Sequence, residues 1–190
     1  MHDLPHTDDE FAPAPPVPGW PKGIGITSIV LASLGLCCGV CGVGMMFAQG
    51  PLMKMAENEM GTPPDVMFAS AGQMILAATG VPFSLVLLFA GIACMRRKAS
   101  GRMLHLIYAI PSILLAVPGT WLAIQQINAQ AAWKAANSGD KWAQQMHPEF
   151  GYFGVAIGLV FSLAWPVFAA IWFGLMSKKP EVGAPESTVI

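Results

Sequence analysis

Charged side chains are scarce in this sequence. Asp, Glu, Lys and Arg make up 11% of its 190 residues, whereas soluble globular domains carry about 25%. So few charges cannot cover a surface that faces water, and hydrophobic residues account for 54% of the chain. The 10 basic and 11 acidic residues nearly cancel, so no basic field attracts nucleic acid. The composition predicts an integral membrane protein. Its expected partner is the lipid bilayer, and we expect it to bind no nucleic acid.

Four long stretches lack charge altogether. A membrane-spanning helix needs roughly 20 apolar residues, and such stretches run over residues 23–47, 71–95, 103–124 and 152–176. The turn 96–102 is so short that the second and third helices must be antiparallel neighbours. We therefore expect an all-α integral membrane protein, an up-and-down bundle of four transmembrane helices over residues 23–176. A disordered Pro-rich tail, 1–22, precedes this domain, and a second tail, 177–190, follows it.

The basic residues are unevenly distributed along the chain. The turn holds Arg96, Arg97, Lys98 and Arg102, the tails hold Lys22, Lys178 and Lys179, and the two longer loops hold only Lys54, Lys134 and Lys141. Cytoplasmic segments of membrane proteins carry an excess of Lys and Arg. The distribution predicts that both termini and the basic turn are cytoplasmic and that the two longer loops face outward.

The two longer loops contain helix signals of their own. In the first, residues 52–60 favour helix after Gly50-Pro51, Gly61 is a stop signal, and Thr62-Pro63 resembles a helix start. In the second, residues 125–137 lack Gly and Pro, so the third helix is expected to project beyond the lipid. Ser138-Gly139-Asp140 then predicts a break before a short segment that contains Trp142.

Small residues recur at helical spacing in the first and fourth predicted spans. The first stripe consists of Ser28, Ala32, Gly35, Gly39 and Gly42, and the second consists of Gly154, Gly158, Ser162, Ala170 and Gly174, with Pro166 in register. Membrane helices associate where small side chains let their backbones approach closely. Both stripes are predicted to pack helices inside the bundle, and the alternative is a contact between molecules.

The fourth span also carries a row of aromatic residues. Phe161, Trp165, Phe168 and Trp172 follow one another at steps of four, three and four, which places them on one helix face. This face is a candidate docking surface for a partner or a flat ligand. The alternative is that the rings simply contact lipid or a neighbouring helix.

Ion and proton pathways usually need charged groups at membrane depth. The predicted spans contain no Asp, Glu, Lys or Arg, and their one histidine, His105, lies near an end. The polar residues there are otherwise Thr27, Ser28, Ser33, Gln73, Thr79, Ser84, Ser112, Thr120 and Ser162. This set argues against a proton-coupled transporter, and it leaves open a passive channel or carrier for a small neutral or lipid-like ligand. His105 and His147 are expected about a membrane thickness apart, so we predict no metal site and no cofactor. Motifs for phosphate, dinucleotide or nucleophilic chemistry are also lacking, which predicts no catalytic residue.

Cysteine is absent from both predicted outer loops. Cys37, Cys38, Cys41 and Cys94 all fall within spans, and Cys38-Gly-Val-Cys41 has the spacing of a redox pair. With four spans, this layout resembles the bacterial membrane quinone reductases that regenerate periplasmic disulfide formation. The resemblance implies a thiol and quinone oxidoreductase that uses Cys38 and Cys41. However, the second outer loop lacks that family's second cysteine pair, and no arginine follows Cys41. The alternative is that these are small apolar residues in a helix contact.

A broader resemblance covers the first quarter of the chain. Pro18-Gly19-Trp20-Pro21-Lys22 continues through Gly25-Ile26 into Ser28-Ile29-Val30-Leu31 and Ser33-Leu34-Gly35-Leu36 of the first span. This start is similar to that of many small, uncharacterised bacterial multi-span membrane proteins. The resemblance implies the bacterial inner membrane and no particular activity. With many packing surfaces and no catalytic group, the leading hypothesis is a non-catalytic structural or accessory subunit. It would form a homo-oligomer or join a larger membrane complex.

Overall fold

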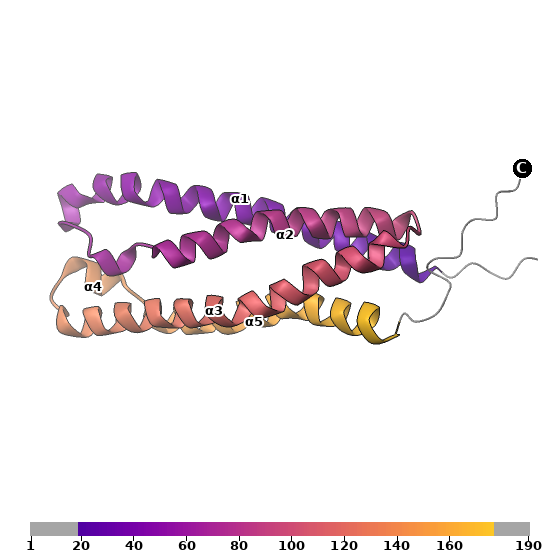
Figure 1. Ribbon diagram of the computed structural model, residues 1–190. Coiled ribbons are helices and arrows are strands. Elements are labelled where there is room, and N and C mark those ends of the chain that lie inside the picture. The colour runs from indigo at the N-terminus through magenta and orange to yellow at the C-terminus, as the bar shows by residue number, and fades with distance from the viewer. Residues whose placement is uncertain (1–18, 177–190) are drawn as a thin grey trace, which may run out of the picture.

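The computed structural model describes residues 19–176, and this part of the chain is helical without any strand (Figure 1). The elements are α1 (Trp20–Met60), the short helix η2 (Asp65–Met67), α2 (Ala71–Met95), α3 (Ser100–Ala136), α4 (Lys141–Gln145), α5 (Pro148–Ile171) and the π-helical turn η3 (Trp172–Met176). Four helices are long and apolar enough to cross a membrane, namely α1, α2, α3 and α5 continued by η3. The prediction of an all-helical chain with four candidate spans is confirmed.

The first helix is longer than predicted at both ends. It begins at Trp20, with Pro21 in its first turn, and it passes through Gly50 and Pro51 without a break. A proline is favoured in the first turn because the N–H that it lacks has no partner there in any helix. Gly61 ends the helix at φ 83°, a left-handed conformation that glycine adopts without steric cost. The predicted stop at Gly61 is confirmed, and the predicted span 23–47 and the helix-favouring residues 52–60 belong to one continuous helix.

The other boundaries follow local capping chemistry. Ser70 and Gln73 form a reciprocal capping box at the start of α2, so this helix begins at Ala71 and the predicted start at Thr62-Pro63 is wrong. The third helix does project as far as Ala136, as expected. After the predicted break, the Asp140 side chain accepts a hydrogen bond from the backbone N–H of Trp142 and starts α4.

The long helices form two pairs that diverge from one end of the molecule (Figure 1). α1 packs along α2, α2 packs along α3, and α3 packs along α5. Within the described residues, no comparable packing joins α1 to α5. The two do approach where the helices converge, because the Trp20 and Trp172 rings meet edge to face at 5.6 Å between centroids. We call this end, which also holds the turn after α2, the basic end.

The opposite end is held together by hydrogen bonds to the segment between α1 and α2, which includes η2. Gln49 of α1 donates to the Met67 carbonyl at 2.7 Å, and Gln126 and Gln130 of α3 both donate to the Val66 carbonyl. The Trp142 indole of α4 donates to the Gly61 carbonyl at 2.9 Å. These hydrogen bonds tie α1, α3 and α4 to the connection between α1 and α2.

Candidate functional site: packing faces, a buried histidine and a hydroxyl-lined cavity

The α1 stripe forms the contact between α1 and α2. Ser28 and Ala32 are fully buried, and a Cβ on Gly35 would lie 2.7 Å from the Ser84 hydroxyl oxygen of α2. A Cβ on Gly39 would make an ordinary contact with Val81, whereas at Gly42 no atom of the described helices lies within 4 Å. The α1 stripe therefore packs inside the chain from Ser28 to Gly39, and the helices have separated at Gly42.

The closest approach of these helices lies one turn nearer the basic end. A Cβ on Gly25 would lie 2.8 Å from the Gly91 carbonyl oxygen, and a Cβ on Gly91 would lie 2.8 Å from the Gly25 carbonyl oxygen. Backbone faces backbone here, so neither position has room for a side chain. Both glycines were missed as packing residues, although Gly25 lies in line with the predicted stripe at a spacing of three before Ser28.

The α5 stripe is used differently from the α1 stripe. Gly154, Gly158 and Ser162 are exposed, and no atom of the structure's described part lies within 4 Å of a Cβ built on Gly154, Gly158 or Gly174. Ala170 is only partly buried. A neighbouring surface of α5 and η3 packs on α3: a Cβ on Gly151 would lie 3.0 Å from the Ile127 Cγ1, and Ala169 and Phe173 are fully buried. The predicted interior contact of this stripe is therefore not made within the chain at its glycines.

The predicted aromatic face forms a continuous ladder of rings. The ring centroids of Trp165 and Phe168 are 5.1 Å apart, and those of Phe168 and Trp172 are 5.8 Å apart in a stacked arrangement. The contact of Trp172 with Trp20 extends the ladder to α1. Phe161 lies beyond the ladder with 77% of its surface exposed. Gly154 and Gly158 precede Phe161 and Trp165 by seven residues each, so glycines and rings share one side of α5.

A buried polar group joins α1 and α3 near the basic end. His105 and Ser28 are both fully buried, with 2.8 Å between the His105 Nε2 and the Ser28 Oγ. The His105 Nδ1 lies 2.7 Å from the Gly101 carbonyl oxygen, and the Phe173 ring stacks on the imidazole at 4.4 Å. Neither side chain is accessible, and together they link α1 to α3. The sequence indicated only that His105 lies near the end of a span.

A cavity of about 350 Å³ lies between α2, α3 and α5. Its polar lining consists of Thr79 and Ser84 from α2, Tyr108 and Ser112 from α3, and Ser162 from α5. Four of these are among the nine polar span residues that the sequence offers, and three separate helices bring them to one place. The channel or carrier hypothesis predicts a continuous polar-lined cavity, whereas this one is a single pocket whose lining is partly apolar.

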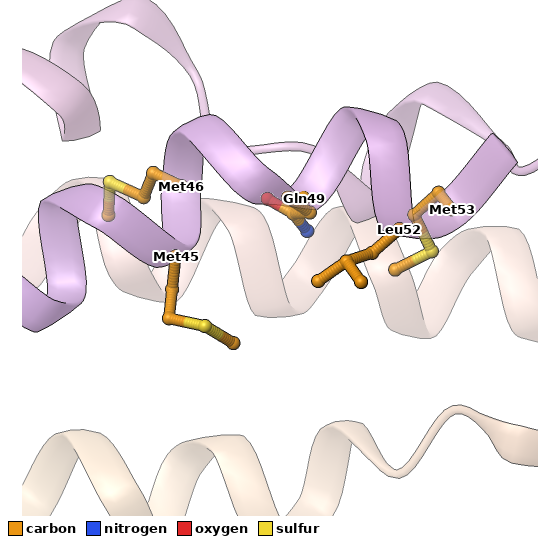
Figure 2. Close-up of a pocket in the computed structure, with 5 residues that line it drawn as sticks. All are labelled: Met45, Met46, Gln49, Leu52 and Met53. Atoms are coloured by element: carbon orange, nitrogen blue, oxygen red, sulfur yellow. The ribbon is translucent and has the colours of Figure 1, made fainter. Parts of the chain in front are cut away.

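A second hollow, of about 370 Å³, lies on α1 toward the opposite end. Figure 2 shows its lining residues, and Met45 and Leu52 extend from the same side of the helix. Gln49, the polar residue of this set, already donates to the Met67 carbonyl. Met46 and Met53 complete the lining, so the hollow is a flexible apolar surface of one helix.

The cysteines of α1 lie outside the helix contacts. Cys37, Cys38 and Cys41 are exposed free thiols, and Cys94 is a buried free thiol at the basic end of α2. The interpretation of the α1 cysteines as residues of a tight helix contact is therefore wrong. Across residues 19–176, no group of three or more His, Cys, Asp or Glu side chains is placed to hold a metal ion. His2 and His6 lie outside the described residues.

The predicted topology residues gather in and beside one turn. Arg96, Arg97 and Lys98 are exposed between α2 and α3, and Arg102 lies in the first turn of α3. Arg97 has φ 54°, the left-handed conformation that allows the chain to reverse. Gly101 packs directly on the backbone of Ala93 and Cys94, so the hairpin is tight and its cations lie at one end of the molecule.

Comparisons with protein-family models, with curated proteins and with solved structures find no match to this chain.

Proposed function

We propose that this chain is a non-catalytic membrane protein, a structural or accessory subunit that acts through helix packing. The observation that supports this is the contrast between its two small-residue stripes. The α1 stripe packs against α2 as far as Gly39, whereas Gly154 and Gly158 of the α5 stripe contact no other helix of the described chain. A Gly-x-x-x-Gly face is self-complementary in membrane helix dimers. The occupant that this pattern favours is α5 of a second copy, in a homo-oligomer.

Lengthening the side chains of the α5 stripe should weaken this association. In Gly154→Leu/Gly158→Leu, the leucines keep the backbones apart, and we expect about tenfold weaker self-association, equal to about 1.4 kcal/mol. The measurement is energy transfer between donor- and acceptor-labelled copies in vesicles at several protein-to-lipid ratios. Ala156→Leu is the matched control, because residue 156 is exposed on the opposite side of α5.

Affinity purification from mildly solubilised native membranes, followed by mass spectrometry, complements that experiment. A self-oligomer that Gly154→Leu/Gly158→Leu dissociates would support the homo-oligomer. A stoichiometric membrane partner of another sequence, lost in the same variant, would assign the α5 stripe to a larger complex. A bare monomer without a partner would count against helix packing as the function.

The proposal includes an orientation in the bacterial inner membrane, with an up-and-down bundle and both termini cytoplasmic. It rests on the cations at the basic end and on their scarcity in the longer loops. In a cysteine-free background, we expect a membrane-impermeant maleimide to label Asn137→Cys in intact cells and Lys98→Cys only after lysis. Both positions are exposed, so the opposite pattern would reverse the orientation.

A further inference from the structure

We propose that the hydroxyl-lined cavity between α2, α3 and α5 binds one neutral lipid through a hydroxyl or amide group that donates hydrogen bonds. The cavity is separate from the glycines of the α5 stripe, and the proposal does not depend on oligomerisation. It rests on the direction of the hydrogen bonds in the lining, on the absence of charge there and on the way the cavity opens.

Four of the five hydroxyl groups in the lining donate their protons to backbone carbonyls, and the fifth, that of Tyr108, is hydrogen-bonded to the Ser112 side chain. Thr79 donates to the Leu76 carbonyl at 2.7 Å, and Ser84 donates to the Gly80 carbonyl at 2.9 Å. On the other helices, Ser112 donates to the Tyr108 carbonyl at 2.7 Å and Ser162 donates to the Leu159 carbonyl at 3.1 Å. A hydroxyl that donates once still has lone pairs to accept with. These four side chains therefore offer acceptors, and the matching ligand is one that donates.

The lining also excludes charged ligands. No Asp, Glu, Lys, Arg or His contributes to it, and its remaining residues are Leu76, Gly80, Phe83, Leu115, Ala116 and Gly119. A phosphate or carboxylate placed here would lose its hydration without a cationic partner, which costs several kcal/mol. A quinone or a fully esterified lipid is neutral but brings acceptors only. An alcohol or an amide satisfies the Ser and Thr oxygens without any change of rotamer.

The size and opening of the cavity suit the head of a lipid. Its volume of about 350 Å³ equals roughly a dozen water volumes, which accommodates a glycerol group and the first atoms of its chains. Gly80 and Ser162 of the lining are exposed, so the cavity opens on the lipid-facing side of the helices. The acyl chains can then remain in the bilayer while the head enters sideways.

The test uses the purified full chain in phosphatidylcholine vesicles with a photoactivatable, alkyne-tagged diacylglycerol. Fluorescence after attachment of a dye gives the fraction of protein labelled, and mass spectrometry locates the labelled peptides. Unlabelled diacylglycerol and its O-methyl ether serve as competitors, because they differ in the single donor. We expect the alcohol to reduce labelling at least fivefold at an excess where the ether has little effect, with labels on α2, α3 and α5.

Variants that fill the cavity provide an independent readout. Gly80→Leu and Gly119→Leu place a side chain where no described atom lies within 4 Å of the new Cβ, so both should fold and reduce labelling at least fivefold. Gly44→Leu on α1, equally open and outside the cavity, is the matched control. Equal competition by alcohol and ether, or labelling that persists in the filled variants, would overturn the proposal. Both results are independent of self-association, which Gly154→Leu/Gly158→Leu tests separately.

Discussion

Gly91→Ala is expected to lower the free energy of unfolding by about 1–3 kcal/mol, the usual cost of overpacking. The added Cβ would lie 2.8 Å from the Gly25 carbonyl oxygen, 2.9 Å from the Ile29 Cγ1 and 3.0 Å from the Ser28 Cβ. The carbonyl belongs to the backbone of α1, so it cannot rotate away as the end of a side chain can. To admit the methyl group, α1 and α2 must move apart along the stretch where Ser28 and Ala32 are buried.

The measurement is reversible unfolding in mixed micelles, followed by circular dichroism as the fraction of denaturing detergent rises. Gly80→Ala is the control on the same helix, because its Cβ meets no described atom within 4 Å. Gly25→Ala should behave like Gly91→Ala, since the clash is reciprocal. Wild-type stability in Gly91→Ala would show that the two backbones are farther apart than the structure places them.

The sequence predicts the spans well because charge and apolar length are local properties. The predicted range 71–95 coincides with α2, and the breaks after Gly61 and around Asp140 occur where expected. The first helix continues through Pro51, since a proline costs a helix one hydrogen bond and does not forbid it. Within one helix, spacing also identified the α1 stripe, because residues at steps of three and four share a face in any α-helix.

The relations between helices could not be predicted in the same way. The neighbour of a helix face depends on the rotation of each helix about its axis and on how far the two helix pairs diverge. Residue spacing within one helix determines neither of these. Similar stripes on α1 and α5 therefore have different neighbours. For the same reason, Thr79, Ser112 and Ser162 were predicted as separate polar residues, and only the packing brings them into one cavity.

His105 is buried by contacts between helices that are distant in the sequence. Removing its side chain is the second change for which we expect a large loss of stability. We expect His105→Ala to lower the free energy of unfolding by about 2–5 kcal/mol, as for other large buried side chains cut to alanine. The change removes the ring stacked on Phe173 and the partner of Ser28. It leaves a hole beside Cys94, Ala109 and Ala169, the buried cluster around Phe173.

The hydrogen bonds of this group fix the tautomer of the neutral imidazole. The Gly101 carbonyl can only accept, so the His105 Nδ1 must carry a proton. In the neutral ring, Nε2 then accepts from the Ser28 hydroxyl. A charged ring would instead donate from Nε2, and the Ser28 hydroxyl would turn to the Ile24 carbonyl, 2.9 Å away. The two states differ only in proton positions. In the neutral state both ring nitrogens of His105 have hydrogen-bond partners in the observed arrangement of α1 and α3.

A double-mutant cycle of Ser28→Ala and His105→Ala separates the hydrogen bond from the packing. Hydrogen bonds between membrane helices average about 0.6 kcal/mol in such cycles and reach about 1.7 kcal/mol. We therefore expect a coupling energy in this range, well below the total loss in His105→Ala. A coupling near zero would mean that Ser28 bonds only to Ile24 and that α1 is held to α3 by shape alone. A coupling equal to the whole loss would instead make this one hydrogen bond, rather than the stack on Phe173, the main link between the two helix pairs.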